Sequence, residues 1–104
     1  MARKPGTDKK GYPFSAEIIE SVWKKGKEIP GFPENVWRWD KCEVIMKKSE
    51  YGSRKSEYGW EVDHINPISN TGDDNLGNLQ PLNWKNNAHK GDKLNWNCPE
   101  IEKD

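Results

Sequence analysis

The chain has 104 residues, 32% of them hydrophobic, with 17 Lys and Arg balancing 17 Asp and Glu, which is enough for one thin-cored domain. Its six tryptophans are expected to form most of the core, because each aromatic side chain can bury on the order of 150–250 Å². No apolar run reaches the roughly 18–20 residues of a membrane span and no signal peptide precedes the polar start, which predicts a soluble, cytoplasmic protein.

The first segment, residues 1–13, contains four cations, two glycines and two prolines. It reads either as a flexible basic arm that touches phosphates or as a frayed terminus. The next segment predicts a helix that begins after Ser15, a good N-cap residue, and ends near Gly26. Four apolar residues of this helix fall at helical spacing, which indicates a packing helix. They are Ile18, Ile19, Val22 and Trp23.

Residues 28–41 hold two proline turns and a short aromatic stretch over 36–39. A strand is predicted over Cys42 to Lys48, with Val44 and Met46 on one face. Residues 49–59 resemble an exposed connection.

From Gly59 onward the turn signals and apolar spacing change and predict a compact unit. Its elements are, in order, a strand over 60–65, a turn-rich loop over 68–77, a strand over 79–82, and a helix over 84–90 capped by Asn83 and ended by Gly91. Together they form a ββα unit within about residues 59–92. The tail over 99–104 is acidic and is expected to be disordered.

The two cysteines, Cys42 and Cys98, do not form a CxxC pair, so this chain alone cannot supply four cysteines to a zinc ion. The two thiols can form a disulfide or stay reduced, and reduced thiols are the more common state in the cytosol.

Four segments of the ββα unit carry a recognisable pattern. They are Trp60-Glu61-Val62-Asp63-His64-Ile65-Asn66-Pro67, Gly72-Asp73-Asp74, Asn78-Leu79-Gln80-Pro81-Leu82 and Asn87-Ala88-His89-Lys90-Gly91-Asp92. In residue type, order and spacing this pattern resembles the signature of the HNH endonucleases. The resemblance covers about a third of the chain. It implies an α+β fold with a small ββα-metal (His-Me finger) core, here joined by an N-terminal packing helix and an additional short strand in a single domain over 14–98.

The resemblance also implies roles for four residues. Asp63 matches a metal ligand and His64 matches the general base. Asn78 matches the residue that holds the loop bearing the histidine. Asn87 matches the third motif position, which places the chain in the H-N-N subgroup.

The chain departs from the family in one respect. Many relatives carry two CxxC pairs that hold a structural zinc, and Asn83 and Asn86 stand here at the positions of the second pair. No structural zinc is therefore expected. We expect Trp60, Trp84 and the N-terminal helix to brace the ββα unit in its place.

The chemistry of these side chains agrees with the resemblance. A neutral imidazole such as that of His64 can take a proton from water. A divalent cation can offset the charge on the phosphate and help the leaving oxygen depart. The oxygen donors of Asp63 and Asn87 suit one Mg²⁺, or Mn²⁺ as the second choice.

Adjacent strand residues point to opposite faces, so Asp63 and His64 can serve one site only if the chain bends near residues 65–67. Asn78 could fix that bend through side-chain hydrogen bonds. On the helix, Asn87 and Lys90 are expected to share one exposed face, as metal ligand and phosphate contact. Trp84 and Ala88 are expected to form the adjoining buried stripe.

Cations that could contact a nucleic acid are Lys90, Lys85, Lys93, Arg54 and Lys55. Residues 1–58 carry 13 Lys and Arg against 9 Asp and Glu, whereas residues 59–104 carry 4 against 8. This asymmetry fits a basic face for phosphates and an acidic face for a cation, but a solvated surface would show the same totals. His89 is interpreted as solvated, and Asp73, Asp74 and Asp92 as turn and cap residues.

The sequence thus predicts a metal-dependent endonuclease that hydrolyses phosphodiester bonds in DNA. Two alternatives stay open. One is a non-catalytic DNA-binding module on the same fold, and the other is the nuclease domain of a bacterial toxin that binds an immunity protein. A homodimer is also left open.

Overall fold

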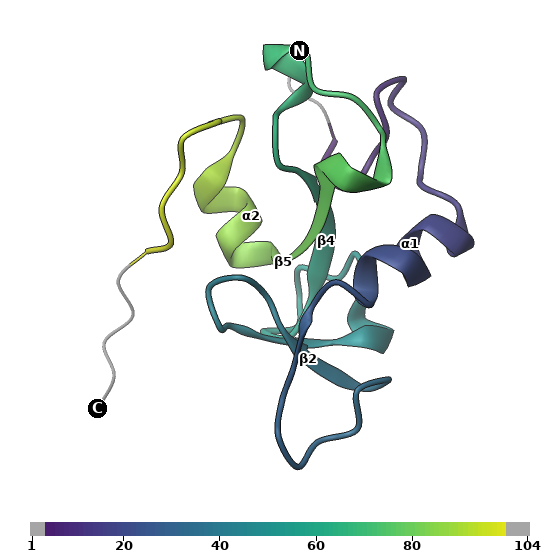
Figure 1. Cartoon of the computed structure of the whole chain (residues 1–104), viewed down its shortest axis with the longest axis vertical. Helices are drawn as coiled ribbons and strands as arrows, with labels where there is room; N and C mark the ends of the chain where they lie inside the picture. The colour runs from purple at the N-terminus through teal and green to yellow at the C-terminus, as the bar shows by residue number, and fades with distance from the viewer. Residues whose placement is uncertain (1–3, 100–104) are drawn as a thin grey trace.

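A computed structural model describes residues 4–99 of the chain (Figure 1). At its centre two antiparallel strands pair in register, and a helix lies on each side of them. These elements are β4 (Trp60–His64), β5 (Leu79–Asn83), α1 (Ala16–Trp23) and α2 (Trp84–Lys90). The mixed fold, with its small antiparallel sheets, confirms the predicted α+β class. Arg3 of the expected basic arm and residues 100–104 of the expected disordered tail lie outside the described range.

The central strands form as the alternating pattern predicts. Trp60 pairs with Asn83 and His64 pairs with Leu79, so all five residues of β4 face a partner on β5. The next element follows without a loop, because the Asn83 side chain caps α2 by accepting from the Lys85 N–H at 3.0 Å. Gly91 ends α2 with a φ of +57°, a conformation that favours glycine.

On one side of these strands α1 supplies the apolar core. The Ser15 hydroxyl accepts from the Ile18 N–H at 3.2 Å and starts the helix where the sequence predicts. Val22 and Trp23 are fully buried against Trp60 of β4 and its neighbours, with the two tryptophan rings 5.1 Å apart.

The expectation that the tryptophans form most of the core is wrong. Only Trp23 and Trp60 are buried, and the other four are half-buried. Valine, methionine and leucine side chains fill the remaining core. Buried and half-buried tryptophans alike place the indole N–H on a backbone carbonyl, that of Trp23 on Glu34 at 3.0 Å and that of Trp84 on Ser56 at 2.8 Å.

A second sheet has the order β1 (Lys27–Glu28), β2 (Trp37–Trp39) and β3 (Ile45–Lys47), all antiparallel. β3 is shorter than the predicted strand over 42–48, and β1 was not predicted. Short 3₁₀ turns complete the fold at η1 (Lys48–Glu50), η2 (Ile68–Asn70) and η3 (Leu76–Asn78). Within the segment expected to be an exposed connection, Tyr51 packs edge-on against Trp60 at 4.8 Å, so part of that segment belongs to the core.

A buried carboxylate joins the second sheet to the ββα unit. Asp40 is 0% exposed and accepts from four donors, the backbone N–H groups of Cys42, Val44 and Asn83 and the side-chain amide of Asn86, at 2.8–3.0 Å. Asn83 also donates to the carbonyls of Ile45 and Glu57. Asp40 and the two asparagines are named the Asp40 hub below. The hub braces the start of α2 together with Trp84, whose backbone and indole N–H groups donate to the carbonyls of Gly59 and Ser56.

A disulfide joins Cys42, before β3, to Cys98, beyond α2. The bond ties the end of the described chain to the second sheet across 56 positions. The expected cytoplasmic location stays a prediction, and the disulfide weighs against it, because disulfides are rare in reducing compartments.

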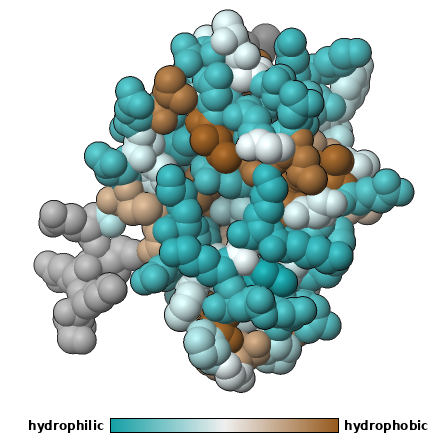
Figure 2. All heavy atoms as spheres, viewed as in Figure 1, coloured by the Kyte–Doolittle hydropathy of each residue, from teal (hydrophilic) through white to brown (hydrophobic). Residues whose placement is uncertain are grey.

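The surface in Figure 2 is mostly hydrophilic, with hydrophobic residues in small groups. The exposed large hydrophobic side chains are Tyr12, Phe32, Ile65, Leu76 and Leu94. Within residues 4–99, none of the helices has the length and apolar character needed to cross a membrane.

Candidate active site

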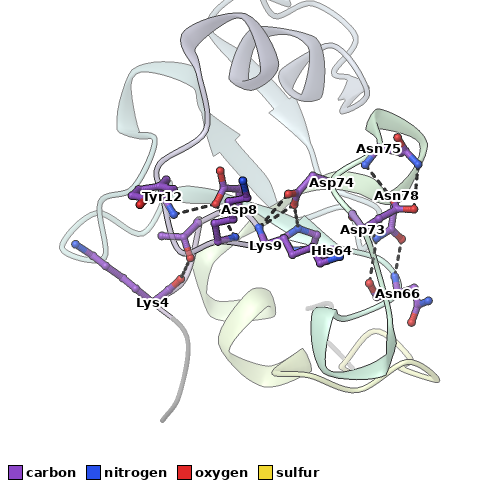
Figure 3. Close-up of polar contacts among 12 residues, drawn as sticks. Lys4, Asp8, Lys9, Tyr12, His64, Asn66, Asp73, Asp74, Asn75 and Asn78 are labelled. Carbon is purple, nitrogen blue, oxygen red and sulfur yellow. Dashed lines mark hydrogen bonds and ion pairs between the residues drawn. The ribbon is translucent and has the colours of Figure 1, made fainter.

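Asn78 holds the bend that follows β4. Its side-chain oxygen accepts from the Asn66 N–H at 2.8 Å, and its amide nitrogen donates to the carbonyls of Asn66 and Asp73 (Figure 3). The Ile65 N–H adds a backbone bond to the Asn78 carbonyl at 2.8 Å. The hydrogen bonds expected of Asn78 are therefore present, and they turn the chain directly after His64.

His64 is 6% exposed and meets a carboxylate. Its Nε2 lies 2.8 Å from Oδ1 of Asp74, a residue interpreted from the sequence as a turn residue only. Because an ionised carboxylate accepts and does not donate, Nε2 carries the proton and Nδ1 is the basic nitrogen of the neutral ring. Asp74 thus selects the tautomer of His64. A carboxylate ten residues after the histidine, within a turn-rich loop, was the only sequence signal for this role.

The N-terminal segment reaches the same place. The Lys9 N–H donates to both carboxylate oxygens of Asp74 at 3.0 Å (Figure 3). Thr7 pairs with Pro13 in an isolated antiparallel bridge. Residues 1–13 were expected to be a flexible arm or a frayed terminus. In the structure, residues 4–13 lie against the loop between β4 and β5 (residues 65–78), named the histidine loop. The reason is that Asp74 and Asp8 offer carboxylate acceptors to their backbone N–H groups, including those of Lys10 and Tyr12.

Asp63 is buried at the opposite side of the strand end. Its Oδ2 accepts from the Gln80 side chain at 2.8 Å, and its Oδ1 lies 3.3 Å from Nζ of Lys90. Burial raises the pKa of the Asp63 carboxyl above its usual value, while the Gln80 hydrogen bond and the Lys90 charge oppose that rise. The carboxyl is therefore held by donors that favour its ionised form.

The expectation that Lys90 shares an exposed face with Asn87 is wrong. Lys90 is 2% exposed, and its ammonium contacts Asp63 and donates to the His64 carbonyl at 2.9 Å. A buried ammonium needs such partners, and the Asp63 carboxylate provides the charge that balances it. Lys90 therefore contacts Asp63 and His64 from the protein interior and does not project toward solvent.

The predicted buried stripe of α2 is also wrong. Ala88 is exposed and Trp84 half-buried, whereas Asn86 and Lys90 are the buried residues of the helix. The polar side of α2 faces inward because Asn86 bonds to Asp40 and Lys90 bonds to Asp63 in the interior.

Asn87 contacts a residue that the sequence interpretation passed over. Its Nδ2 donates to Oε1 of Glu61 at 2.7 Å, and Glu61 is 4% exposed. Arg54 binds the same carboxylate through two bonds, from Nε to Oε2 at 2.9 Å and from Nη2 to Oε1 at 2.8 Å. Glu61 precedes Asp63 by two residues, so both carboxylates lie on the face of β4 that α2 covers. That spacing was the signal that could have identified Glu61.

One cavity of about 580 Å³ brings the candidates together. Asp63, His64 and Asn87 all line it, and Asn78, whose side chain holds the bend, does not. The remaining walls come from the N-terminal segment, Arg54, Val62 of β4, the start of the histidine loop and the end of α2. They comprise Lys4, Pro5, Gly6, Thr7, Arg54, Val62, Pro67, Ile68, Ser69, Ala88, Gly91 and Asp92.

The other cation candidates lie elsewhere. Lys85, Lys93 and Lys55 are exposed and do not line the cavity, whereas Arg54 and Lys4 do. His89 is exposed, as expected, and accepts from the indole N–H of Trp96 at 2.8 Å.

The donor set can be compared with what a cation requires. Over residues 4–99, the structure holds no group of three His, Cys, Asp or Glu side chains that could bind a metal ion. Asp63 and Asn87 instead offer two hard oxygen donors in one cavity, a set that fits Mg²⁺, which usually takes one or two protein ligands and keeps several waters.

Comparison with known protein families gives one match. Residues 54–96 match the family model described as HNH endonuclease. The matched stretch covers β4, β5 and α2 with Arg54 and the histidine loop. No curated protein and no solved structure matches the chain significantly.

Proposed function

We propose that this chain is a metal-dependent endonuclease that hydrolyses phosphodiester bonds in DNA, because residues 54–96 match the HNH endonuclease family model. Nuclease activity on nucleic acid is what the family indicates. The observation that carries the finer proposal is the cavity in which Asp63, His64 and Asn87 meet.

His64 is the general base in this proposal. With Nε2 committed to Asp74, Nδ1 is free to accept a proton from a water molecule at the phosphate. When the ring takes that proton it becomes an imidazolium, and the Asp74 carboxylate stabilises the new charge 2.8 Å away. Asp74 is therefore a positioning residue for the base.

Asp63 and Asn87 would hold the divalent cation, Mg²⁺ as first choice and Mn²⁺ as second. When bound, the cation supplies charge neutralisation at the phosphate and at the leaving oxygen. Lys90 and Gln80 fix the Asp63 carboxylate from beneath, so that its position does not depend on the ligand.

The substrate phosphate enters a cavity with cationic walls. Arg54 and Lys4 stand at these walls and would contact phosphate oxygens, and the exposed Lys85, Lys93 and Lys55 would contact the flanking backbone. We place the catalytic domain at residues 14–98, with its ββα core at 59–92 and the segment before it closing one wall. A homodimer and an immunity protein stay predictions that neither the fold nor the family match supports.

A plasmid assay tests the proposed function. Supercoiled DNA incubated with the chain and Mg²⁺ or Mn²⁺ should be nicked, and EDTA should stop the reaction. His64→Ala should lower the rate by about 10³-fold at unchanged thermal stability, since a general base contributes roughly 10²–10⁴-fold. The matched control is His89→Ala, the other histidine of the chain, which lies outside the cavity and should leave the rate unchanged.

An RNA substrate run in parallel separates DNA from RNA preference. A parent chain that nicks neither substrate with either metal would refute the proposed function. A His64→Ala variant as active as the parent would refute only the assigned base.

A further inference from the structure

Glu61 is a buried carboxylate that the mechanism above does not use. It accepts three hydrogen bonds, two from Arg54 and one from Asn87, while only 4% of the residue is exposed. Burying a carboxylate is costly unless it is paired, so its presence in the middle of β4 calls for a reason. A plain ion pair that fastens α2 to β4 would be one.

The position of the two donors, Arg54 and Asn87, favours a different reason. Arg54 and Asn87 both line the cavity, so Glu61 joins two of its walls. A carboxylate held by a guanidinium can only accept hydrogen bonds, which means that the Asn87 atom facing it must be the amide nitrogen. The amide group is planar, and its oxygen therefore points away from Glu61.

This orientation matters for cation binding, because an amide oxygen is a hard ligand and an amide nitrogen is not. An unrestrained asparagine could present either atom to the cavity. The Glu61 contact removes one of the two choices, and the bidentate Arg54 contact in turn fixes Glu61.

Resting on the proposed function, we propose that Glu61 is a positioning residue for the cation site: it holds the Asn87 carboxamide with its oxygen available to the cation, and Arg54 holds Glu61. The roles of Glu61 and of Lys90 are then parallel. Each fixes one of the two cation ligands from outside the coordination shell.

A charge-neutral variant tests this role without changing the local charge. Arg54→Met combined with Glu61→Leu removes one positive and one negative group together. The Arg54 side chain is 40% exposed and that of Glu61 6%, so the double variant removes a partly buried ion pair and leaves neither charge alone, whereas Glu61→Ala would leave Arg54 without its carboxylate. Mn²⁺ binding is measured by titration calorimetry on the full chain, with no nucleic acid present.

The double variant is expected to bind Mn²⁺ about 10-fold more weakly than the parent, since loss of an outer-shell partner costs roughly 10–100-fold. Asn87→Ala should weaken binding as well. The triple variant should bind no more weakly than Asn87→Ala alone, because Glu61 acts only through Asn87. Glu20→Ala is the control, because it breaks an ion pair with Lys48 far from the cavity lining and should leave Mn²⁺ affinity unchanged.

A second measurement needs no metal. In the metal-free chain, the side-chain amide signals of Asn87 in a ¹⁵N–¹H NMR spectrum should shift upfield in the double variant, because a charge-assisted bond is lost. Parent-like Mn²⁺ affinity, additive losses in the triple variant or unchanged Asn87 signals would each overturn the role of Glu61. A parent chain that binds no Mn²⁺ but shows the expected NMR shift would instead locate the failure in the proposed function.

Discussion

The two faces of β4 differ in chemistry although both are buried. One face carries Trp60 and Val62 into the apolar core beneath α1, and the other carries Glu61 and Asp63 toward α2. The apolar face gains free energy from burial itself. The polar face is stable only because each carboxylate has a cationic and an amide partner. The comparison separates a face that packs the apolar core from a face that fixes the two proposed cation ligands, Asp63 and Asn87.

Breaking one polar pair should give the largest effect on stability. Lys90→Met leaves the Asp63 carboxylate buried without its ammonium, and we expect a loss of about 4 kcal/mol in the free energy of unfolding. Urea unfolding measures it. The double variant Lys90→Met/Asp63→Leu serves as the control and should recover most of that loss, because neither charge then remains. A single variant within about 1 kcal/mol of the parent would contradict the comparison.

At the His64 end of β4, breaking a polar contact should lower the nicking rate instead of the free energy of unfolding. Asp74→Ala removes the partner that sets the His64 tautomer, and we expect nicking to slow on the order of 10²-fold. Asp73→Ala is the matched control, since Asp73 is an exposed neighbour whose side chain bonds only Asn75 among the contacts described. Equal rates for the two variants would show that Asp74 does not position the base.

On the apolar face the expected change is smaller and has no effect on the cation. Val22→Ala removes two methyl groups from a fully buried position of α1, which packs on this face and does not line the cavity, and should cost about 2 kcal/mol through lost burial and the space left behind. Mn²⁺ affinity, measured below the unfolding transition, should equal that of the parent. A loss of affinity as large as that of Asn87→Ala would mean that the two faces are not independent.

The smallest expected effect concerns the ionisation of Tyr51, which packs edge-on against Trp60 of β4. Burial, with a lesser contribution from the Glu61 charge, raises the pKa of Tyr51 to about 12. The folded chain holds the phenolic proton of Tyr51 more tightly than an unfolded chain, in which a tyrosine has a pKa of about 10. The contribution of this proton to the free energy of unfolding is therefore fully present below about pH 10 and is lost between about pH 10 and 12. In an absorbance titration the last tyrosine to ionise should disappear in Tyr51→Phe. If the ionisation step at the highest pH is unchanged in that variant, the step belongs to another tyrosine.

The elements of the ββα unit could be predicted because their signals are local. The Asn83 cap, Gly91 after the last turn of α2 and the residue pattern of β4 each act within a few residues, as does the Ser15 cap of α1 outside the unit. The bend after His64 was also predictable, because it follows from the need to bring Asp63 and His64 to one site.

The polar partners could not be predicted in the same way, because they join residues that lie far apart in the chain. Lys90 meets Asp63 across 27 positions, and Asn87 meets Glu61 across 26. A charged residue on a helix is ordinarily solvated, so no local signal in the sequence predicts that this lysine is buried. The same holds for the disulfide, since two cysteines allow pairing but do not require it.

The Asp40 hub has a practical consequence for enzymology. The groups that fasten α2 to the second sheet are a carboxylate, backbone N–H groups and amides, all covalently part of the chain. A chelator cannot extract any of them. If EDTA stops nicking, the loss would therefore indicate removal of the proposed cation from the cavity, with the fold intact. A melting curve recorded with and without chelator, in the absence of added metal, should superimpose.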